Sequence, residues 1–305
     1  MKKHTITFLT LVASLLIAVP ALAQLRVVAS IPDLAAIAKE VGGTRAVVES
    51  LASHAVDPHY VDPRPSLVLS LNKADLLIVN GLELESSWLD PLVKQARNAK
   101  INPGGPGHFI AAKHAVLIDV PTQKIDRAMG DVHPGGNPHF YQDPTSAIAI
   151  ANALRDRLAA LDPTGAATYA KNAETFTQEL WRVAKAEALR FARLPESDRR
   201  VVSYHKSLGY ILRWLNLEAV ETVEPRPGVP PNPRHVARVL AAMKKGGISV
   251  IVQEDYYPAK TSETLAKLAG GVVVKLPGAT NFDGGERYVE RVKKAAGRLY
   301  DAISK

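Results

Sequence analysis

Residues 166–194 read AATYAKNAETFTQELWRVAKAEALRFARL and contain neither glycine nor proline. Such a stretch predicts one uninterrupted helix, which Asp162-Pro163 separates from the segment before it. A helix of this length spans about 43 Å at 1.5 Å per residue. This exceeds one small lobe, so the helix could run along two. Its apolar residues drift around the helix and hold no strict heptad, as the positions of Tyr169, Ala173, Phe176, Leu180, Val183 and Leu189 show.

Apolar runs alternate with amphipathic segments on both sides of this helix. This alternation predicts an α/β fold with two lobes, each a mostly parallel sheet flanked by helices. The strands expected before the helix are 25–30, 46–51, 76–79 and 115–120, with helices at 34–41, 65–73, 89–98 and 145–161. The strands expected after it are 201–204, 217–223, 248–253 and 272–276, with helices at 205–214, 232–245, 261–268 and 285–304. The expected boundaries are 24–161 for the first lobe, 162–195 for the connecting helix and 196–305 for the second lobe.

The first 23 residues have the pattern of a secretory signal peptide. A basic start at Lys2-Lys3 is followed by an apolar stretch that closes with Ala21-Leu22-Ala23, an A-x-A cleavage pattern. The apolar stretch is short for a transmembrane anchor. We therefore expect a mature chain that begins at Gln24 and lies in the periplasm. No cysteine follows the cleavage site, so a lipoprotein anchor is not expected.

The composition excludes several classes of function. The absence of cysteine rules out disulfides and thiolate metal sites. The formal net charge is +8, and removing Lys2 and Lys3 with the signal leaves +6. The basic residues are scattered, without the aromatic interleaving of single-strand binders, so we expect no nucleic-acid partner.

Three of the nine histidines lie at turns that lead from a predicted strand toward a helix, where open α/β sheets bind ligands. His59 and His139 each follow a proline and precede an aromatic residue, and His205 directly follows the strand 201–204. The proline restricts the backbone and so limits the entropy lost when the imidazole takes one direction. Three converging imidazoles suit Zn²⁺, with carboxylate or water in the fourth position; Mn²⁺ prefers more oxygen ligands.

The chain resembles the metal-binding substrate-binding proteins of zinc and manganese ABC importers. The likeness rests on Val27-Val28-Ala29-Ser30-Ile31, Asp57-Pro58-His59, Gly136-Asn137-Pro138-His139-Phe140 with Asp143-Pro144, and Tyr204-His205. The resemblance implies two lobes joined by one long rigid helix, with a metal ion in the cleft between them. It implies His59 and His139 as ligands from the first lobe and His205 from the second.

Further expectations follow from the same resemblance. Manganese members place a carboxylate at the third position, so His205 favours Zn²⁺ as the transported ion. The partner would be an ABC transporter membrane permease, and we expect a monomer that is not an enzyme. Because neutral imidazoles bind the ion, its affinity should fall below about pH 6.5.

The fourth ligand is left open. The family often supplies a carboxylate from the loop after the last strand, where Asp283 is the best candidate. Glu254 and Asp255 end a predicted strand, and water could also complete the site. Each acid has an alternative structural role, as an Asx-turn for Asp283 and as helix caps for the other two.

The interval 102–137 lacks the long His- and acid-rich loop of many zinc members, since it holds only His108, His114 and His133. His133 is a candidate accessory ligand or a solvated loop residue. Two other functions compete: a binding protein for manganese, iron or a metal chelate, and a secreted zinc hydrolase that activates water. The hydrolase is disfavoured because no His-Glu-x-x-His helix is present.

Overall fold

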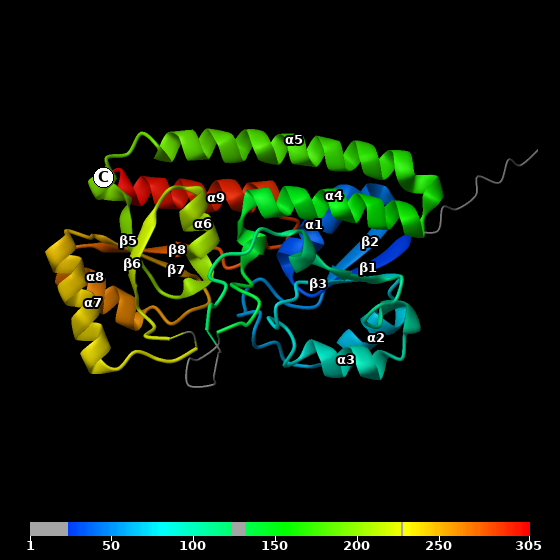
Figure 1. Cartoon of the computed structure of the whole chain (residues 1–305), viewed down its shortest axis with the longest axis horizontal. Coiled ribbons are helices and arrows are strands. Elements are labelled where there is room, and N and C mark those ends of the chain that lie inside the picture. The colour runs from blue at the N-terminus through cyan, green and yellow to red at the C-terminus, as the bar shows by residue number, and fades with distance from the viewer. Residues whose placement is uncertain (1–23, 124–131, 227) are drawn as a thin grey trace, which may run out of the picture.

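Figure 1 shows the computed structural model of the chain, which describes residues 24–123, 132–226 and 228–305. Two four-stranded parallel sheets form its two lobes, and their strand orders, β2-β1-β3-β4 and β6-β5-β7-β8, correspond position by position. The predicted fold class is therefore confirmed. The first sheet contains β1 (Leu25–Ala29), β2 (Ala46–Ser50), β3 (Leu76–Val79) and β4 (His108–Ile110). The second contains β5 (Arg200–Ser203), β6 (Glu218–Thr222), β7 (Val250–Glu254) and β8 (Val272–Leu276).

The fourth strand of the first sheet differs from the sequence prediction. The predicted strand 115–120 is wrong, because β4 lies at His108–Ile110 and pairs with β3, with Phe109 opposite Ile78. Phe109 is buried, whereas Val116 and Val120 are 61% and 54% exposed. The run at 115–120 is therefore only partly buried, through Leu117 and Ile118, and it is not a strand of the sheet. The true edge strand was missed because it is short and follows a glycine-rich segment, Gly104–Gly107.

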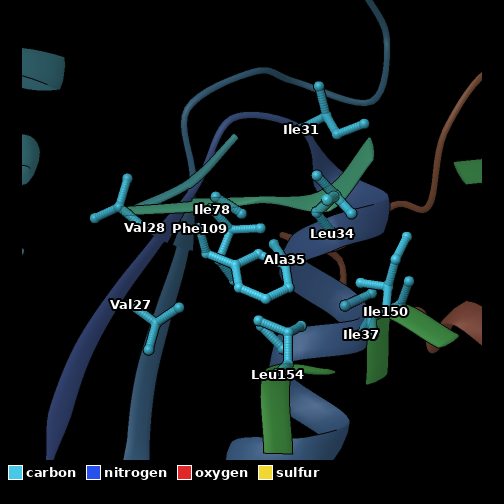
Figure 2. Close-up of a cluster of buried hydrophobic side chains, with 14 of the residues drawn as sticks. Val27, Val28, Ile31, Leu34, Ala35, Ile37, Ile78, Phe109, Ile150 and Leu154 are labelled. Atoms are coloured by element: carbon cyan, nitrogen blue, oxygen red, sulfur yellow. The ribbon is translucent and has the colours of Figure 1, made fainter. Parts of the chain in front are cut away.

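The first hydrophobic core includes residues of the first sheet and of several helices, among them α1 (Pro32–Gly42) and α4 (Pro144–Leu161). Figure 2 shows Leu34 and Ile37 of α1 close to Ile150 and Leu154 of α4, with Phe109 nearby. The Asp143 side chain caps α4 by accepting hydrogen bonds from the backbone N–H groups of Thr145 and Ser146. The other helices are α2 (Pro65–Lys73), α3 (Leu89–Ala96), α6 (Gly209–Trp214), α7 (Pro233–Gly246) and α8 (Lys260–Ala269).

The long helix α5 (Ala166–Phe191) confirms the uninterrupted segment expected between the two lobes. It is three residues shorter than predicted, because Arg199 donates hydrogen bonds to the carbonyls of Ala192 and Leu194 beyond its end. Its 26 residues span about 39 Å, and Figure 1 shows it extending along both lobes. None of the described helices is both long and apolar enough to cross a membrane.

The C-terminal helix α9 (Tyr288–Ile303) also connects the lobes. Its first turns, with Tyr288, Val289 and Val292, belong to the first core, whereas Ala295 and Leu299 belong to the second. It packs beside α5 (Figure 1). Two helices, α5 and α9, therefore bridge the lobes. This arrangement resists a wide hinge motion of one lobe relative to the other.

A buried pair of oppositely charged side chains lies where α1 meets α9. Asp33 of α1 and Arg291 of α9 are 0% and 1% exposed, and Asp33 Oδ1 lies 3.6 Å from Arg291 Nε. Thr280, from the loop after β8, donates from Oγ1 to Asp33 Oδ1 at 2.9 Å and from its backbone N–H to Oδ2 at 3.3 Å. This contact ties the loop after β8, in the second lobe, to the first lobe.

Candidate metal centre

The turn that carries His59 is built by the residue two positions before it. Asp57 Oδ1 accepts one hydrogen bond from the His59 backbone N–H at 3.0 Å and another from the ring Nδ1 at 2.7 Å. Pro58 fixes the backbone between them, and its carbonyl accepts a hydrogen bond from Trp88 Nε1. The ring therefore has one direction, and His59 is 9% exposed.

The turn that carries His139 repeats this construction. Asn137 Oδ1 accepts from the His139 backbone N–H at 3.1 Å and from ring Nδ1 at 2.8 Å. Asn80, directly after β3, donates from Nδ2 to the Pro138 carbonyl at 2.9 Å. His139 is thus held at the carboxyl edge of the first sheet, although it does not directly follow a strand. It is 2% exposed.

His205 is oriented by a residue that follows the neighbouring strand β6. Ser203 of β5 pairs with Thr222 of β6, so the residues two positions further on, His205 and Glu224, lie side by side. Glu224 Oε2 accepts a hydrogen bond from His205 Nδ1 at 2.7 Å. His205 is 5% exposed and Glu224 is 8% exposed.

All three rings therefore have Nδ1 bonded to an oxygen acceptor. A carboxylate or amide oxygen can only accept, so in the neutral ring Nδ1 carries the proton and Nε2 keeps its lone pair. Such hydrogen bonds typically orient histidines that bind metal. The Nε2 of His139 is buried and has no hydrogen-bond partner, which is an unfavourable state unless a ligand is bound there.

The three rings lie close together, although they come from both lobes. Their centres are 5.2 Å apart for His59 and His139, 5.5 Å for His139 and His205, and 6.3 Å for His59 and His205. Tetrahedral Zn²⁺ with bonds of about 2.0–2.1 Å holds neighbouring ring centres roughly 5 Å apart. Among the described residues, no three His, Asp or Glu side chains are already placed to hold one metal ion together, so we expect the histidine side chains to shift when an ion binds.

Burial and neighbouring charges set the protonation of the site. Burial lowers the pKa of His139 well below its usual value, and the three nearby histidines lower it further. Burial also disfavours protonation of His205, but Glu224 outweighs this effect and raises the pKa of His205. Burial opposes ionisation of Asp57, yet its hydrogen bonds from His59 leave its pKa lowered. The site therefore combines a neutral, buried His139 with two histidines that are each hydrogen-bonded to a carboxylate. This combination suits a divalent cation.

His133 also lies at this site. Its Nε2 is 3.3 Å from Nε2 of His59, with ring centres 5.4 Å apart. Together with His139 and His205, it lines a small cavity between the lobes. His133 is therefore not simply a solvated loop residue, because it contacts a candidate ligand.

The acidic candidates for a fourth ligand do not line the cavities that contain the histidines. Asp283 is exposed in the turn after β8 and lines neither of the cavities that contain the histidines. Thr280 is the residue of this loop that points inward, to Asp33. Asp255 is exposed and accepts from the Gly278 backbone N–H. Glu254 is buried and accepts from Ser207 Oγ, and burial raises its pKa.

Sequence reasoning gave no orienting role to Asp57, Asn137 or Glu224. The first two had a detectable signal, because Asp-Pro-His and Asn-Pro-His place the same side-chain oxygen two positions before a histidine. Glu224 had none, since it lies 19 residues from His205 and meets it only through strand pairing.

Comparisons with known proteins identify the family and the fold of this chain. The family model described as ZnuA, Zinc-uptake complex component A periplasmic, matches residues 27–302. "Manganese-binding lipoprotein MntA" of Halalkalibacterium halodurans is 23% identical over 285 residues, 92% of this chain and 89% of that protein. "Metal ABC transporter substrate-binding lipoprotein SloC" of Streptococcus mutans is 23% identical over 250 residues, 81% of this chain and 78% of that protein.

A solved structure, "Crystal structure of ZnuA", shares the fold with a TM-score of 0.76 at 23% identity, covering 92% of this chain and 99% of the other. The matched family comprises solute-binding proteins and not enzymes, which confirms the prediction of a non-catalytic role. The chain therefore belongs to the family of periplasmic zinc-uptake complex component A proteins, the metal-binding substrate-binding components of ABC transporters.

Proposed function

We propose that this protein captures Zn²⁺ between its two lobes with His59, His139 and His205 and delivers the ion to an ABC transporter membrane permease. The observation that carries the proposal is the shared orientation of the rings, in which each Nδ1 is bonded to oxygen and Nε2 is left for a ligand. Asp283 is not in the proposed ligand set, because it is exposed and away from the cavity.

The donor atoms favour zinc over manganese. Mn²⁺ prefers oxygen ligands, whereas imidazole suits Zn²⁺. The carboxylates of Asp57 and Glu224 lie beside the histidines, but each already accepts a hydrogen bond from an Nδ1. The two carboxylates therefore orient the histidines, and we do not include them among the metal ligands. Manganese or iron as the cargo remains the alternative that experiment has to distinguish.

Metal titration of the chelator-treated protein tests this function. Wild type should bind Zn²⁺ more tightly than Mn²⁺ in a competition calorimetry experiment. His139→Ala should weaken Zn²⁺ binding by more than about 100-fold, beyond the roughly 10–100-fold expected for the loss of an outer hydrogen-bond partner. His108→Ala is the matched control, because His108 lies on β4 and lines a different cavity. Tight Mn²⁺ binding with weak Zn²⁺ binding would overturn the choice of metal.

The location and assembly are also proposals. Residues 1–23 lie outside the described residues, and the predicted signal peptide falls within them. We propose cleavage before Gln24, release into the periplasm without a lipid anchor, and a monomer. The mass of the mature protein recovered from the periplasm tests the cleavage site, and light scattering tests the monomer. A retained N-terminal segment or a lipid-modified mass would refute the soluble form.

A further inference from the structure

The contact between His133 and His59 has the spacing of two ligands on one metal ion. Bonds of about 2.0–2.1 Å in a tetrahedral site place neighbouring ligand nitrogens roughly 3.3 Å apart. The observed distance between the two Nε2 atoms is 3.3 Å, and the rings are 5.4 Å apart at their centres. Because His59 Nδ1 donates to Asp57, its Nε2 faces His133 as an acceptor. A cation can take the place of the proton shared by these two nitrogens.

The backbone near His133 is held in place. The His133 carbonyl accepts from the Gly136 backbone N–H at 3.2 Å, which closes a turn. Asn137, the next residue, donates from its backbone N–H to the Ile118 carbonyl and from Nδ2 to the Lys206 carbonyl at 2.9 Å. Tyr210 Oη donates to the Asn137 carbonyl at 2.8 Å. This turn is therefore anchored to the second lobe, close to His205.

His133 also lies beside histidines other than His59. It lines the cavity that His139 and His205 share, and it contributes to the electrostatic environment of His139. His205 also lines a second cavity with His59 and Glu224. None of the three acidic candidates from the sequence occurs in either cavity.

We propose that His133 is the fourth metal ligand and binds through Nε2, giving a centre of four imidazole nitrogens. This inference rests on the proposed function and specifies its selectivity. A fourth nitrogen removes the position where a carboxylate or water would supply oxygen, so it disfavours Mn²⁺ relative to Zn²⁺. In a tetrahedral centre the Nε2 atom of His133 would lie as close to those of His139 and His205 as it already lies to that of His59.

The test combines affinity with a direct count of ligands. His133→Ala and His133→Gln are compared with His114→Ala, which removes an exposed histidine stacked on Phe109 outside the site. X-ray absorption of the zinc-loaded full chain should show four imidazoles in wild type and His114→Ala, and three in both His133 variants. Zinc affinity, measured by chelator competition, should fall at least about tenfold in the His133 variants, with a smaller loss for Mn²⁺.

The outcomes separate this inference from the proposed function. If wild type binds no zinc, the proposed function fails. If wild type binds zinc but shows three imidazoles and one oxygen, His133 is not a ligand and only the inference fails. A loss of affinity in His133→Ala without a change in imidazole count also overturns the ligand role. Thermal unfolding of the metal-free variants confirms that each one folds.

Discussion

Replacing Asp33 with Asn should destabilise the protein more than removing its partner Arg291. Both side chains are buried, and a guanidinium cannot lose its charge in a protein. Asp33→Asn therefore leaves an uncompensated buried cation, which costs about 3–5 kcal/mol. In Arg291→Met the remaining carboxyl can take up a proton, because burial already raises the pKa of Asp33. Its cost should be that of an incompletely paired polar group, about 1–3 kcal/mol.

The double variant provides the decisive comparison. Asp33→Asn with Arg291→Met removes both charges and should be more stable than Asp33→Asn alone. The matched control is Arg287→Met, because Arg287 adjoins the start of α9, and 43% of its side chain is exposed beside Glu40 and Glu179. That change should cost less than about 1 kcal/mol.

Urea unfolding at neutral pH, followed by circular dichroism, measures these differences. The free energy of unfolding is compared for the four variants and wild type at matched denaturant slopes. If Asp33→Asn costs no more than Arg287→Met, or if the double variant loses the sum of the two single losses, the reasoning about an unpaired buried cation is refuted.

Three further outcomes follow from the structure. Glu224→Gln should weaken zinc binding about 10–100-fold in chelator competition. Glu221→Gln, three residues earlier on β6 and paired with Arg238, should not; equal affinities of Glu224→Gln and wild type would contradict the orienting role. Partial burial opposes ionisation of Asp162, but hydrogen bonds from Thr164, Tyr169 and Arg45 outweigh it and lower its pKa to about 2. Because this pKa is depressed, Asp162 stabilises the fold above about pH 4 and loses that contribution as the pH falls toward 2; acid titration of unfolding should show a shallower loss in Asp162→Asn, and an unchanged slope would contradict it. Zinc at 100 times its dissociation constant should raise the free energy of unfolding by about 2.7 kcal/mol, reversibly with chelator in a thermal melt; a gain that persists in His139→Ala would point to binding elsewhere.

The fold could be predicted from sequence because its signals are local. The apolar runs Val27–Ala29 in β1 and Val250–Val252 in β7 are buried on both faces of their sheets, and α5 has no residue that breaks a helix. The missed strand β4 is only three residues long, and a single buried side chain, Phe109, distinguishes it from the exposed run that follows. Such a short strand exists because β3 provides its partner, which no local pattern reveals.

The sequence by itself determined the alternating α/β pattern, the long helix and the two Asx-Pro-His turns, since each depends on residues within a few positions of one another. Only the tertiary structure decided what surrounds the histidines. Strand register brings Glu224 to His205, a turn brings His133 to His59, and the loop after β8 directs Thr280 inward while Asp283 stays in solvent. These contacts join segments distant in sequence, and they form only because parallel sheets gather the carboxyl ends of their strands at one edge.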